Sequence, residues 1–442
     1  MIKPINKLTA EYPQHLKQLQ QRTKQALSRE NIEGIVIHSG QEVKVFLDDN
    51  TYPFKVNPHF KHWLPLIDVP NCWLIINGED KPTLIYYQPV DFWHKIIPLT
   101  ESYWGEFFNI KILEKASDVD KLLPYDKKDF AYIGSHIEVA NALGFEAINP
   151  ESLLNYFHYH RAYKTAYEHE CLRQSNYLAV TAHKVAKAAF LSGDTEFEIQ
   201  NAYLNAIGYT TNETPYGNIV ALNKNCSILH YMDSDKSAPQ THQSFLIDAG
   251  ANFNGYAADI TRSYSFKLDK FAELITRMDQ LMLSAVMGLK PGISYADLHI
   301  ATFKEIAQVL VEFNFINVSA DTAIDSGIVS TFFPHGLGHH LGLQVHDVGG
   351  FMADERGTHI NAPEAHPFLR SSRVIEAGQV FTIEPGLYFI DSLLKNLKES
   401  ANSDQVNWQK VDEMRAFGGI RIEDNIIVHQ SHNENMTRDL GL

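Results

Sequence analysis

The chain has 442 residues, of which 44% are hydrophobic and 21% charged, as is ordinary for a globular protein of about two domains. Its net charge of −15, without a long lysine or arginine run, argues against nucleic acid and anionic membranes as partners. Cys72, Cys171 and Cys226 form no C-x-x-C pair and no apolar run reaches membrane-spanning length, so we expect a cytoplasmic protein without a disulfide framework or thiolate zinc site.

The first part of the chain alternates helix and strand signals. A helix is predicted over residues 11–29, followed by the apolar run IEGIVIHSG (32–40). Residues 72–89 predict two strands joined by a turn at 77–80. These patterns predict a small α/β domain over residues 1–160 without metal-ligand spacing. The aromatic stretch 52–66 is expected to anchor a loop in the core, with a subunit contact or a lid as the alternative.

The pattern changes near residue 166, where a long helix is predicted up to Gly193. Residues 195–198 read Thr-Glu-Phe-Glu, a capping-box signature that starts a second helix. The phrases GDTEFEI (193–199) and GISYADL (292–298) are similar, and each follows one helix and opens another. They predict two related halves within a C-terminal domain over residues 161–442.

Four acidic residues occur in segments that are otherwise apolar. Asp248 ends SFLIDAG, Asp259 lies inside GYAADITRSY, Glu384 inside FTIEPGLYFI and Glu423 inside GIRIEDNIIV. A carboxylate rarely sits in an apolar strand unless it is paired or binds a metal. Turn residues between the two aspartates predict a hairpin that brings them together.

A histidine-rich segment, FPHGLGHHLGLQVHD (333–347), accompanies these acids. Four carboxylates and one imidazole can hold two divalent ions about 3.5–4 Å apart and support a hydrolytic displacement. Hard oxygen ligands favour Mn²⁺, with Co²⁺ as an alternative, over a thiolate-type zinc site. A single structural metal or an acidic network is the competing interpretation.

The order of these residues and their motifs carries a family resemblance. HGLGHHLGLQVHD (335–347), IEPG (383–386) and GGIRIEDN (418–425) resemble the metal-ligand motifs of the "pita-bread" metallopeptidases, and most closely those of the short bacterial Xaa-Pro dipeptidases, or prolidases. FLDDNTYPFKVNP (46–58) and PVDFWHK (89–95) extend the resemblance to the first domain. It implies an α/β (α+β) protein with a small N-terminal α/β domain followed by a C-terminal pita-bread domain.

The resemblance also implies roles for the metal ligands. Asp248 would bind one ion, Asp259 and Glu423 would bridge both ions, and His339 and Glu384 would bind the second. Glu384 would also relay a proton during catalysis.

The other polar residues receive catalytic and substrate roles. His335 and His346 would assist catalysis, whereas His340 matches no functional position and is expected at the periphery. Arg421 lies two residues before Glu423 and should point to the same face. We expect substrate contacts from His230, Arg370, Arg421, Tyr216, Tyr295 and Asp49. His230 and Arg370 would take the C-terminal carboxylate of a dipeptide, although a surface salt bridge remains an alternative for Arg370.

The implied activity is metal-dependent hydrolysis of Xaa-Pro dipeptides. Hydrolysis of phosphotriesters and fluorophosphonates, as by organophosphorus acid anhydrolases, is an expected side activity because their phosphorus is tetrahedral. We also expect a homodimer, or a dimer of dimers, in which Asp48 or Asp49 of the first domain helps to close the partner's site. Two alternatives are an Xaa-Pro aminopeptidase acting on longer peptides and an inert pita-bread binding module without metals.

Overall fold

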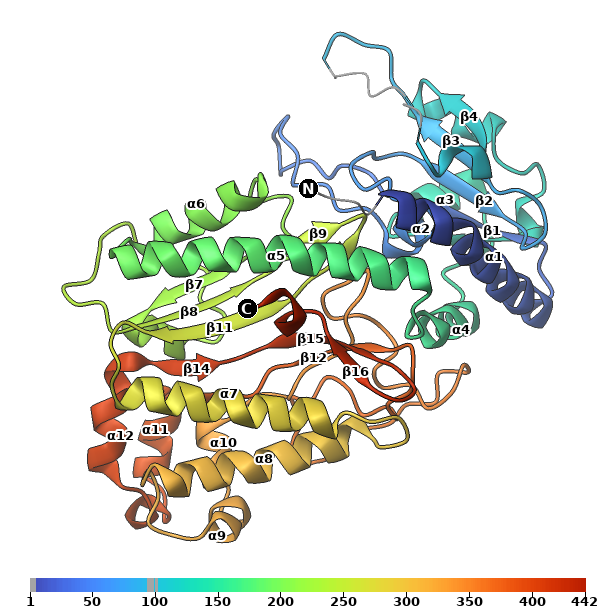
Figure 1. Cartoon of the computed structure of the whole chain (residues 1–442). Helices are drawn as coiled ribbons and strands as arrows, with labels where there is room; N and C mark the ends of the chain where they lie inside the picture. The colour runs from blue at the N-terminus through green and yellow to red at the C-terminus, as the bar shows by residue number, and fades with distance from the viewer. Residues whose placement is uncertain (1–4, 94–98, 100–101) are drawn as a thin grey trace. The chain divides into compact units, whose positions relative to one another are not determined.

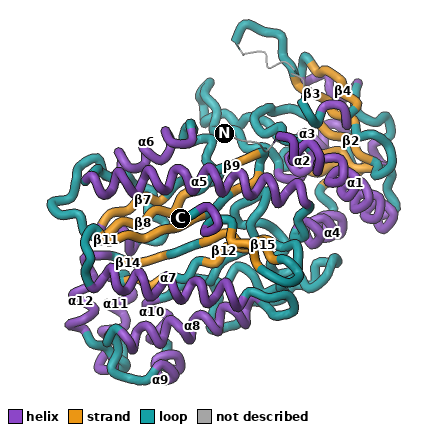
Figure 2. Tube along the Cα trace, viewed as in Figure 1, coloured by secondary structure: helices purple, strands orange, loops and turns teal. Residues whose placement is uncertain are grey.

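The computed structural model describes residues 5–93, 99 and 102–442, which fold into a first and a second compact unit (Figure 1). The first unit comprises Met1–Cys171 together with Phe253–Tyr256 and Asp354–Thr358, and the remaining residues make up the second unit. His94 and Lys95, at the end of the motif PVDFWHK, lie outside the described residues. Helices and strands alternate in both units, so the mixed α/β class is confirmed (Figure 2).

The first unit is built on a six-stranded sheet with the order β4-β3-β2-β1-β5-β6. Strand β1 pairs antiparallel with β2 and parallel with β5, and β2 and β3 form the predicted hairpin. Its strands are β1 Gly34–His38, β2 Trp73–Ile76, β3 Thr83–Tyr87, β4 Asn109–Leu113, β5 Phe130–Ile133 and β6 Ala147–Ile148. Its helices are α1 Ile5–Glu30, α2 Pro58–Trp63, α3 Ile137–Leu143 and α4 Glu151–Arg161.

The aromatic stretch of the first unit is divided between core and surface. Phe60 and Trp63, on α2, are 0% and 4% exposed, so this half anchors the segment as expected. The start of the stretch has the opposite character, because Tyr52 is 56% exposed, as are Phe46 (86%) and Leu47 (91%) in the loop before it. Both interpretations of this stretch therefore keep a structural counterpart.

The second unit places its strands between two pairs of helices (Figures 1 and 2). Helices α5 and α6 share one apolar cluster with β7 and β8, whereas α7 and α8 pack on β12 and β15 in a second cluster. Its sheets have the orders β11-β8-β7, β12-β15-β16 and β13-β14, and the two-stranded sheet β10-β9 includes Phe253 and Tyr256, which group with the first unit. The strands of this part of the chain are β7 Ile219–Leu222, β8 Ser244–Ala249, β9 Asn252–Phe253, β10 Tyr256–Ala257, β11 Ile260–Ser265, β12 Val380–Ile383, β13 Gly386–Tyr388, β14 Gly419–Arg421, β15 Asp424–Val428 and β16 Asn433–Asn435. The helices are α5 Ala166–Ser192, α6 Glu196–Ile207, α7 Lys270–Gly288, α8 Tyr295–Glu312, α9 Ala320–Asp325, α10 Ile328–Phe332, α11 Asp391–Lys398 and α12 Trp408–Met414.

The repeated sequence phrase marks the starts of α6 and α8. Thr195 caps α6 in a full capping box with Glu198, and Ser294 caps α8 by accepting a hydrogen bond from the Asp297 backbone nitrogen. The capping box is confirmed. The two similar phrases begin helices that belong to the two different apolar clusters of the second unit.

Two expectations about the whole chain concern cysteines and membranes. The three cysteines are free and buried. Among residues 5–93, 99 and 102–442, every helix lacks the combination of length and apolar character that a bilayer crossing requires.

A charged contact ties α5 to β16 and predicts an acid-sensitive contribution to stability. Arg173 donates from Nε to Glu434 Oε1 at 2.6 Å and from Nη2 to Oε2 at 2.8 Å, and His429 lies 3.0 Å from the same carboxylate. These partners, Arg173 foremost, lower the pKa of Glu434 from 4.5 to about 2. We expect Glu434→Gln to lower the free energy of unfolding at pH 7 by about 1–2 kcal/mol.

The sign of the pH dependence follows from the direction of this shift. The ionised carboxylate stabilises the folded state fully above its unfolded pKa, and this contribution is lost as the pH falls from about 4.5 to about 2. Urea unfolding of both proteins at pH 7, 5 and 3.5 should therefore show a difference that shrinks with acidity. An equal difference at all three pH values would mean that the ion pair contributes nothing.

Candidate metal centre

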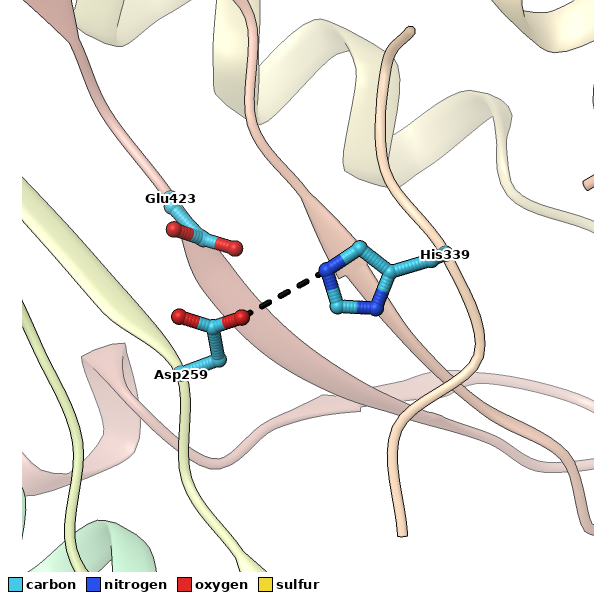
Figure 3. A group of neighbouring side chains, drawn as sticks. All are labelled: Asp259, His339 and Glu423. Atoms are coloured by element: carbon cyan, nitrogen blue, oxygen red, sulfur yellow. Dashed lines mark ion pairs between the residues drawn. The ribbon is translucent and has the colours of Figure 1, made fainter. Parts of the chain in front are cut away.

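Asp259, His339 and Glu423 meet in the interior of the second unit (Figure 3). One ligand atom from each lies within 4.8 Å of the others, and His339 Nε2 is 3.4 Å from Asp259 Oδ2. The three residues are 5%, 3% and 2% exposed, respectively. Three potential metal ligands from distant parts of the chain thus converge in a buried place.

Three of the four acids lie at breaks between strands, not inside continuous strands as the sequence predicted, whereas Asp248 lies near the end of β8 as predicted. Asp259 precedes β11, Glu384 lies between β12 and β13, and Glu423 lies between β14 and β15. At each break the backbone bonds outside the regular ladder: Glu423 N donates to Thr261 O at 3.0 Å and Glu384 N to Leu337 O at 2.8 Å. The prediction of continuous strands was wrong because a short apolar sequence does not show where its backbone changes partner.

His339 is oriented through its backbone and its ring. Its backbone nitrogen donates to Thr382 Oγ1 at 3.1 Å, and its Nδ1 lies 3.0 Å from the His340 carbonyl. A carbonyl can only accept, so Nδ1 carries a hydrogen and Nε2 is the ring atom that faces the acids. The preceding Gly338 has φ +151°, and a Cβ there would lie 2.3 Å from Thr382 O, so only glycine allows this approach.

Glu384 and Asp248 lie beside this group. Glu384 Oε1 is 3.7 Å from His339 Nε2, and both acids line the same cavity as Asp259. Asp248 accepts a hydrogen bond from Arg421 Nη2 at 2.6 Å and one from the Tyr216 hydroxyl at 2.8 Å. The structure therefore brings all five predicted ligands to one cavity, with Asp248 engaged by an arginine and a tyrosine.

Asn425 clamps the backbone of Asp259. Its Oδ1 accepts from Asp259 N at 3.0 Å, and its Nδ2 donates to Asp259 O. Asn425 is 0% exposed, and its own backbone nitrogen donates to Thr437 Oγ1 at 3.0 Å. Because Asn425 lies in β15, two residues after Glu423, this clamp fixes Asp259 relative to the segment that carries Glu423.

Burial raises the pKa of three of the four acids. It raises the pKa of Glu384 to about 7, although the nearby His339 acts in the opposite direction. Burial, with the negative charge of Asp259, raises the pKa of Glu423 well above its usual range. The pKa of Asp248 is also raised by burial, against the effect of the adjacent arginine.

Asp259 differs because His339 is its direct partner. Burial alone would raise the pKa of Asp259, but the ion pair with His339 outweighs burial and lowers it. The pKa of His339 is raised overall by Asp259, although burial lowers it. The positive charge near these four buried carboxylates is therefore too small for all of them to be ionised near pH 7.

This donor set fits divalent cations. A bound cation would compensate the excess of carboxylates that otherwise raises their pKa values. The oxygen-rich set with one imidazole suits hard or intermediate divalent ions, and the His339 ring already presents Nε2. The residues present therefore match a divalent metal centre.

The cavity beside the acids has a volume of about 1310 Å³. His230, His335, His346 and Arg370 line it together with the acids and Arg421. Arg370 and His230 are exposed, and their side chains form no hydrogen bond or ion pair with any residue in the described part of the chain. The cavity thus offers two cationic or neutral nitrogen groups that are available to a ligand.

His335 is fixed by two hydrogen bonds. Its Nδ1 lies 2.7 Å from the Gly336 carbonyl and so donates, while its Nε2 lies 2.8 Å from the Tyr388 hydroxyl and accepts. The same hydroxyl accepts from Arg421 Nη1 at 3.1 Å. Burial, assisted by the charge of Arg421, lowers the pKa of His335 to about 3, so this ring is neutral near pH 7.

His346 packs directly against His339. Its ring centroid is 4.3 Å from that of His339 in an edge-to-face arrangement. Burial, followed by the effect of His339, lowers the pKa of His346 to about 4. It is thus a neutral imidazole at the cavity wall near pH 7.

Three expected substrate contacts do not appear among the described residues that line the cavity. Tyr295 is 0% exposed and donates to Thr382 O at 2.8 Å, so it supports the His339 segment from behind. Tyr216 is directed at Asp248, and Asp49 is exposed in the first unit.

His340 does not lie at the periphery, and that prediction was wrong. It is 0% exposed and forms an isolated bridge with Phe381, whose ring is 4.4 Å away. Its surrounding glycines suggested an exposed turn, but this segment runs along β12 and its alternate residues face opposite sides.

Sequence reasoning missed Tyr388, Thr261 and Asn425. Thr261 donates from Oγ1 to Glu423 Oε2 at 2.7 Å and accepts from Arg421 Nε at 3.2 Å. Thr261 and Asn425 each follow a predicted ligand by two residues, so the spacing that identified Arg421 would also have found them. No comparable signal marks Tyr388.

The chain belongs to metallopeptidase family M24, whose sequence profile matches residues 170–430. The profile of the N-terminal domain of Xaa-Pro dipeptidases matches residues 10–159. An Xaa-Pro dipeptidase of Colwellia psychrerythraea is 81% identical over 99% of this chain and 98% of its own length. One from Pseudoalteromonas translucida is 58% identical over 99% of this chain and 100% of its own length. The family resemblance is thus confirmed, and the family implies divalent metal ions.

Solved structures extend the likeness to the fold. Aminopeptidase P from Escherichia coli has a TM-score of 0.73 at 23% identity, covering 96% of this chain and 95% of its own. Proline aminopeptidase P II from Yersinia pestis has a TM-score of 0.70 at 22% identity, covering 98% and 96%. An N-terminal α/β domain followed by a pita-bread domain, as predicted, is therefore confirmed.

Proposed function

We propose that this chain is an Xaa-Pro dipeptidase, which hydrolyses the bond before a C-terminal proline. The proposal is based on the 81% identity of this chain, over nearly the whole of both chains, to a protein of that name. The cavity supports the proposal because it combines the clustered acids with Arg370, an exposed cation suited to a terminal carboxylate.

We propose two divalent ions, most simply Mn²⁺ with Co²⁺ as an alternative, held by the four acids and His339. Asp248 would bind the first ion, His339 and Glu384 the second, and Asp259 and Glu423 both. When bound, such ions polarise a carbonyl and lower the pKa of water.

The protein's own residues would then bind substrate and move protons. Glu384 is proposed to carry a proton to the leaving imino nitrogen of proline, and His346 to stabilise the developing charge on the scissile carbonyl. His335 is held in one orientation by Tyr388 and Gly336. We propose that it acts from the same wall of the cavity as His346. Arg421 stabilises Asp248 and, through Tyr388, His335.

Substrate selection would depend on proline and on a free C-terminus. Proline's tertiary amide has no N–H, so a site that accepts it cannot rely on that donor. Arg370 and His230 are proposed to bind the terminal carboxylate. Tyr216 and Tyr295 would then act from behind the wall, through Asp248 and Thr382.

The test of this function compares substrates on one metal-loaded preparation. Protein stripped with a chelator and reconstituted with MnCl₂ should hydrolyse Ala-Pro and Leu-Pro, and the stripped protein should not. The tripeptide Ala-Pro-Ala should be cleaved at least tenfold more slowly, on the scale of about 1.4 kcal/mol. Equal cleavage would indicate an aminopeptidase, and absence of both metal and activity would indicate a binding module.

We further propose that neutral phosphotriesters and fluorophosphonates are side substrates. Their tetrahedral phosphorus resembles the tetrahedral geometry reached during amide hydrolysis. The cavity volume of about 1310 Å³ leaves room for groups larger than a dipeptide. Hydrolysis of a p-nitrophenyl phosphotriester, followed by its colour, tests this directly.

We propose a homodimer, or a dimer of dimers, in which the first unit contributes to the partner's site. Phe46 and Leu47 are 86% and 91% exposed, and such apolar exposure on one loop suits a subunit contact. Asp49, which follows them, would meet the amine of the dipeptide.

The expected result is a dimer in sedimentation at micromolar concentration, and a shift toward monomer in the variant Phe46→Asp/Leu47→Asp. The shift should be accompanied by lost activity on Leu-Pro. Fully active monomers of the unaltered protein would contradict the prediction, and Tyr125→Asp, at a fully exposed position elsewhere in the first unit, is the control.

Two coarser expectations complete the proposal. We place the domain boundary near residue 160, since the two family profiles end at residue 159 and begin at residue 170. Three free, buried cysteines suit the reducing cytoplasm, where we propose that the protein acts.

A further inference from the structure

Glu196 is a buried carboxylate that the mechanism above does not use. It is the first residue of α6 and is 1% exposed. Its position in the sequence predicts no role beyond the start of a helix. A buried carboxylate at such a position needs hydrogen-bond donors, and their identity shows what it does.

Four donors surround this carboxylate. Oε1 accepts from Leu222 N at 2.7 Å and from Asn225 Nδ2 at 2.9 Å, and Oε2 accepts from the Tyr231 hydroxyl at 2.7 Å and from Asp235 N at 2.9 Å. All four lie within residues 222–235, which run from the last residue of β7 into its connection to β8, and we call this segment loop 222–235. Glu196 therefore holds both ends of this loop and its middle.

The outer part of the loop depends on a single tie. Across residues 228–234, and within the described chain, the Tyr231–Glu196 bond is the one hydrogen bond that leaves the loop. Tyr231 is 6% exposed, whereas its neighbours Ile228 and Met232 are 49% and 63% exposed. Without the Glu196 carboxylate, this part would lose its hydrogen bond to the body of the unit and keep the packing of Tyr231 against Ile219, Ala221, Cys226 and Leu246.

The same loop forms part of the cavity wall. Six of its residues line the cavity: Lys224, Asn225, Ser227, Ile228, Leu229 and His230. None of the five proposed metal ligands is among them. A change in the loop should therefore alter how substrate binds while leaving the metal centre in place.

We propose that Glu196 is a positioning residue for substrate: it fixes loop 222–235, and through it His230, against the cavity. The proposal rests on the proposed function for the identity of the substrate. It makes Glu196 a determinant of substrate affinity, although the carboxylate itself never touches the substrate.

The variant Glu196→Gln tests the proposal, with Glu198→Gln as matched control. Glutamine keeps the shape but offers one acceptor oxygen where two face donors, so two donors lose their partner. Within the described chain, the carboxylate of Glu198, two residues later, accepts hydrogen bonds from Thr195 in the capping box and none from loop 222–235. Both variants are prepared as full chains loaded with Mn²⁺.

In Glu196→Gln we expect faster hydrogen exchange over residues 222–235 and a Michaelis constant for Leu-Pro raised about tenfold, with kcat and metal content nearly unchanged. Glu198→Gln should show neither change. Because Glu196 acts through His230, adding Glu196→Gln to His230→Ala should raise the constant no further. Additive effects, unchanged exchange or an unchanged Michaelis constant would each overturn the proposal.

Two provisions keep the outcome decisive. If Glu196→Gln does not fold, Tyr231→Phe removes the middle tie, together with the hydrogen bond that this hydroxyl accepts from Asn225 Nδ2 at 3.1 Å, and should produce the same changes in weaker form. An unchanged Tyr231→Phe protein would contradict the proposal. If the unaltered protein cleaves no Xaa-Pro dipeptide, the proposed function fails. Hydrogen exchange then decides separately whether Glu196 holds the loop.

Discussion

Asp259→Asn should abolish hydrolysis of Leu-Pro and leave the fold intact. The carboxylate lies 3.4 Å from His339 Nε2 and within 4.8 Å of a Glu423 oxygen, so it is central to the proposed site of both ions. An amide has no charge and only one acceptor oxygen, and a residue shared by two ions weakens both when it is replaced. We expect kcat/KM to fall at least about a thousandfold, which corresponds to about 4 kcal/mol.

The measurement combines metal content, circular dichroism and kcat/KM on protein saturated with Mn²⁺. The backbone of Asp259 is held by Asn425, and this clamp does not involve the replaced carboxylate, so the folded structure should survive. Asp297→Asn is the matched control because it makes the same chemical change at an exposed position in the first turn of α8. Substantial activity in the saturated Asp259→Asn protein would show that the assignment of two ions is wrong.

Arg370→Ala should raise the Michaelis constant for Leu-Pro by about ten- to a hundredfold. Arg370 is exposed at the cavity wall, and its guanidinium has no hydrogen bond or ion pair within the described chain. Within the described chain, Arg370 thus has no acidic partner for the surface salt bridge that was the alternative interpretation. Exposure reduces the expected effect below that of a buried arginine, because water screens the interaction with the carboxylate.

A neutral substrate distinguishes carboxylate binding from a structural role. A p-nitrophenyl phosphotriester has no carboxylate, so its kcat/KM should change less than threefold in Arg370→Ala, on the scale of about 0.6 kcal/mol. Arg370→Lys should recover part of the affinity for Leu-Pro, since the charge is kept and the bidentate geometry is lost. Equal losses on both substrates would show that Arg370 supports the metals or the fold.

The sequence predicted those parts of the fold that depend on local chemistry. Thr195 and Glu198 form a capping box whose spacing can be read directly, and the start of α6 follows from it. The second unit also contains a hairpin in which β11 pairs with β8, as the turn residues after Asp248 predicted. Such features depend on a short turn or cap whose residues are close in the sequence, so a local pattern can reveal them.

Features that depend on distant packing could not be predicted. The breaks at Glu384 and Glu423 arise because the backbone there bonds to Leu337 and to Thr261, and no local pattern records those partners. Likewise, the short segments 253–256 and 354–358 group with the first unit although they lie far along the chain.

The candidate site shows the same division. Isolated acids in apolar runs pointed to the ligands, because burying a carboxylate is costly and demands a reason. Their partners were less visible: Arg421 followed from two-residue spacing, whereas Tyr388 and Glu196 are ordinary residues of a strand and a helix start. The prediction for His340 was wrong because its glycine neighbours suggested an exposed turn, whereas its backbone forms a buried bridge with Phe381.

The site is assembled from parts that the ribosome makes at very different times. Asp248 and Asp259 flank one hairpin, but Thr261 of that hairpin bonds to Glu423, which lies 162 residues further along the chain. Until residues 419–425 are synthesised, the nascent hairpin lacks Arg421 as well as Glu423 and Asn425. Contacts of such long sequence separation form late in folding. The protein is therefore expected to acquire its ions only after residues 419–425 have been synthesised, so metal supply acts after this step and not on the earlier nascent chain.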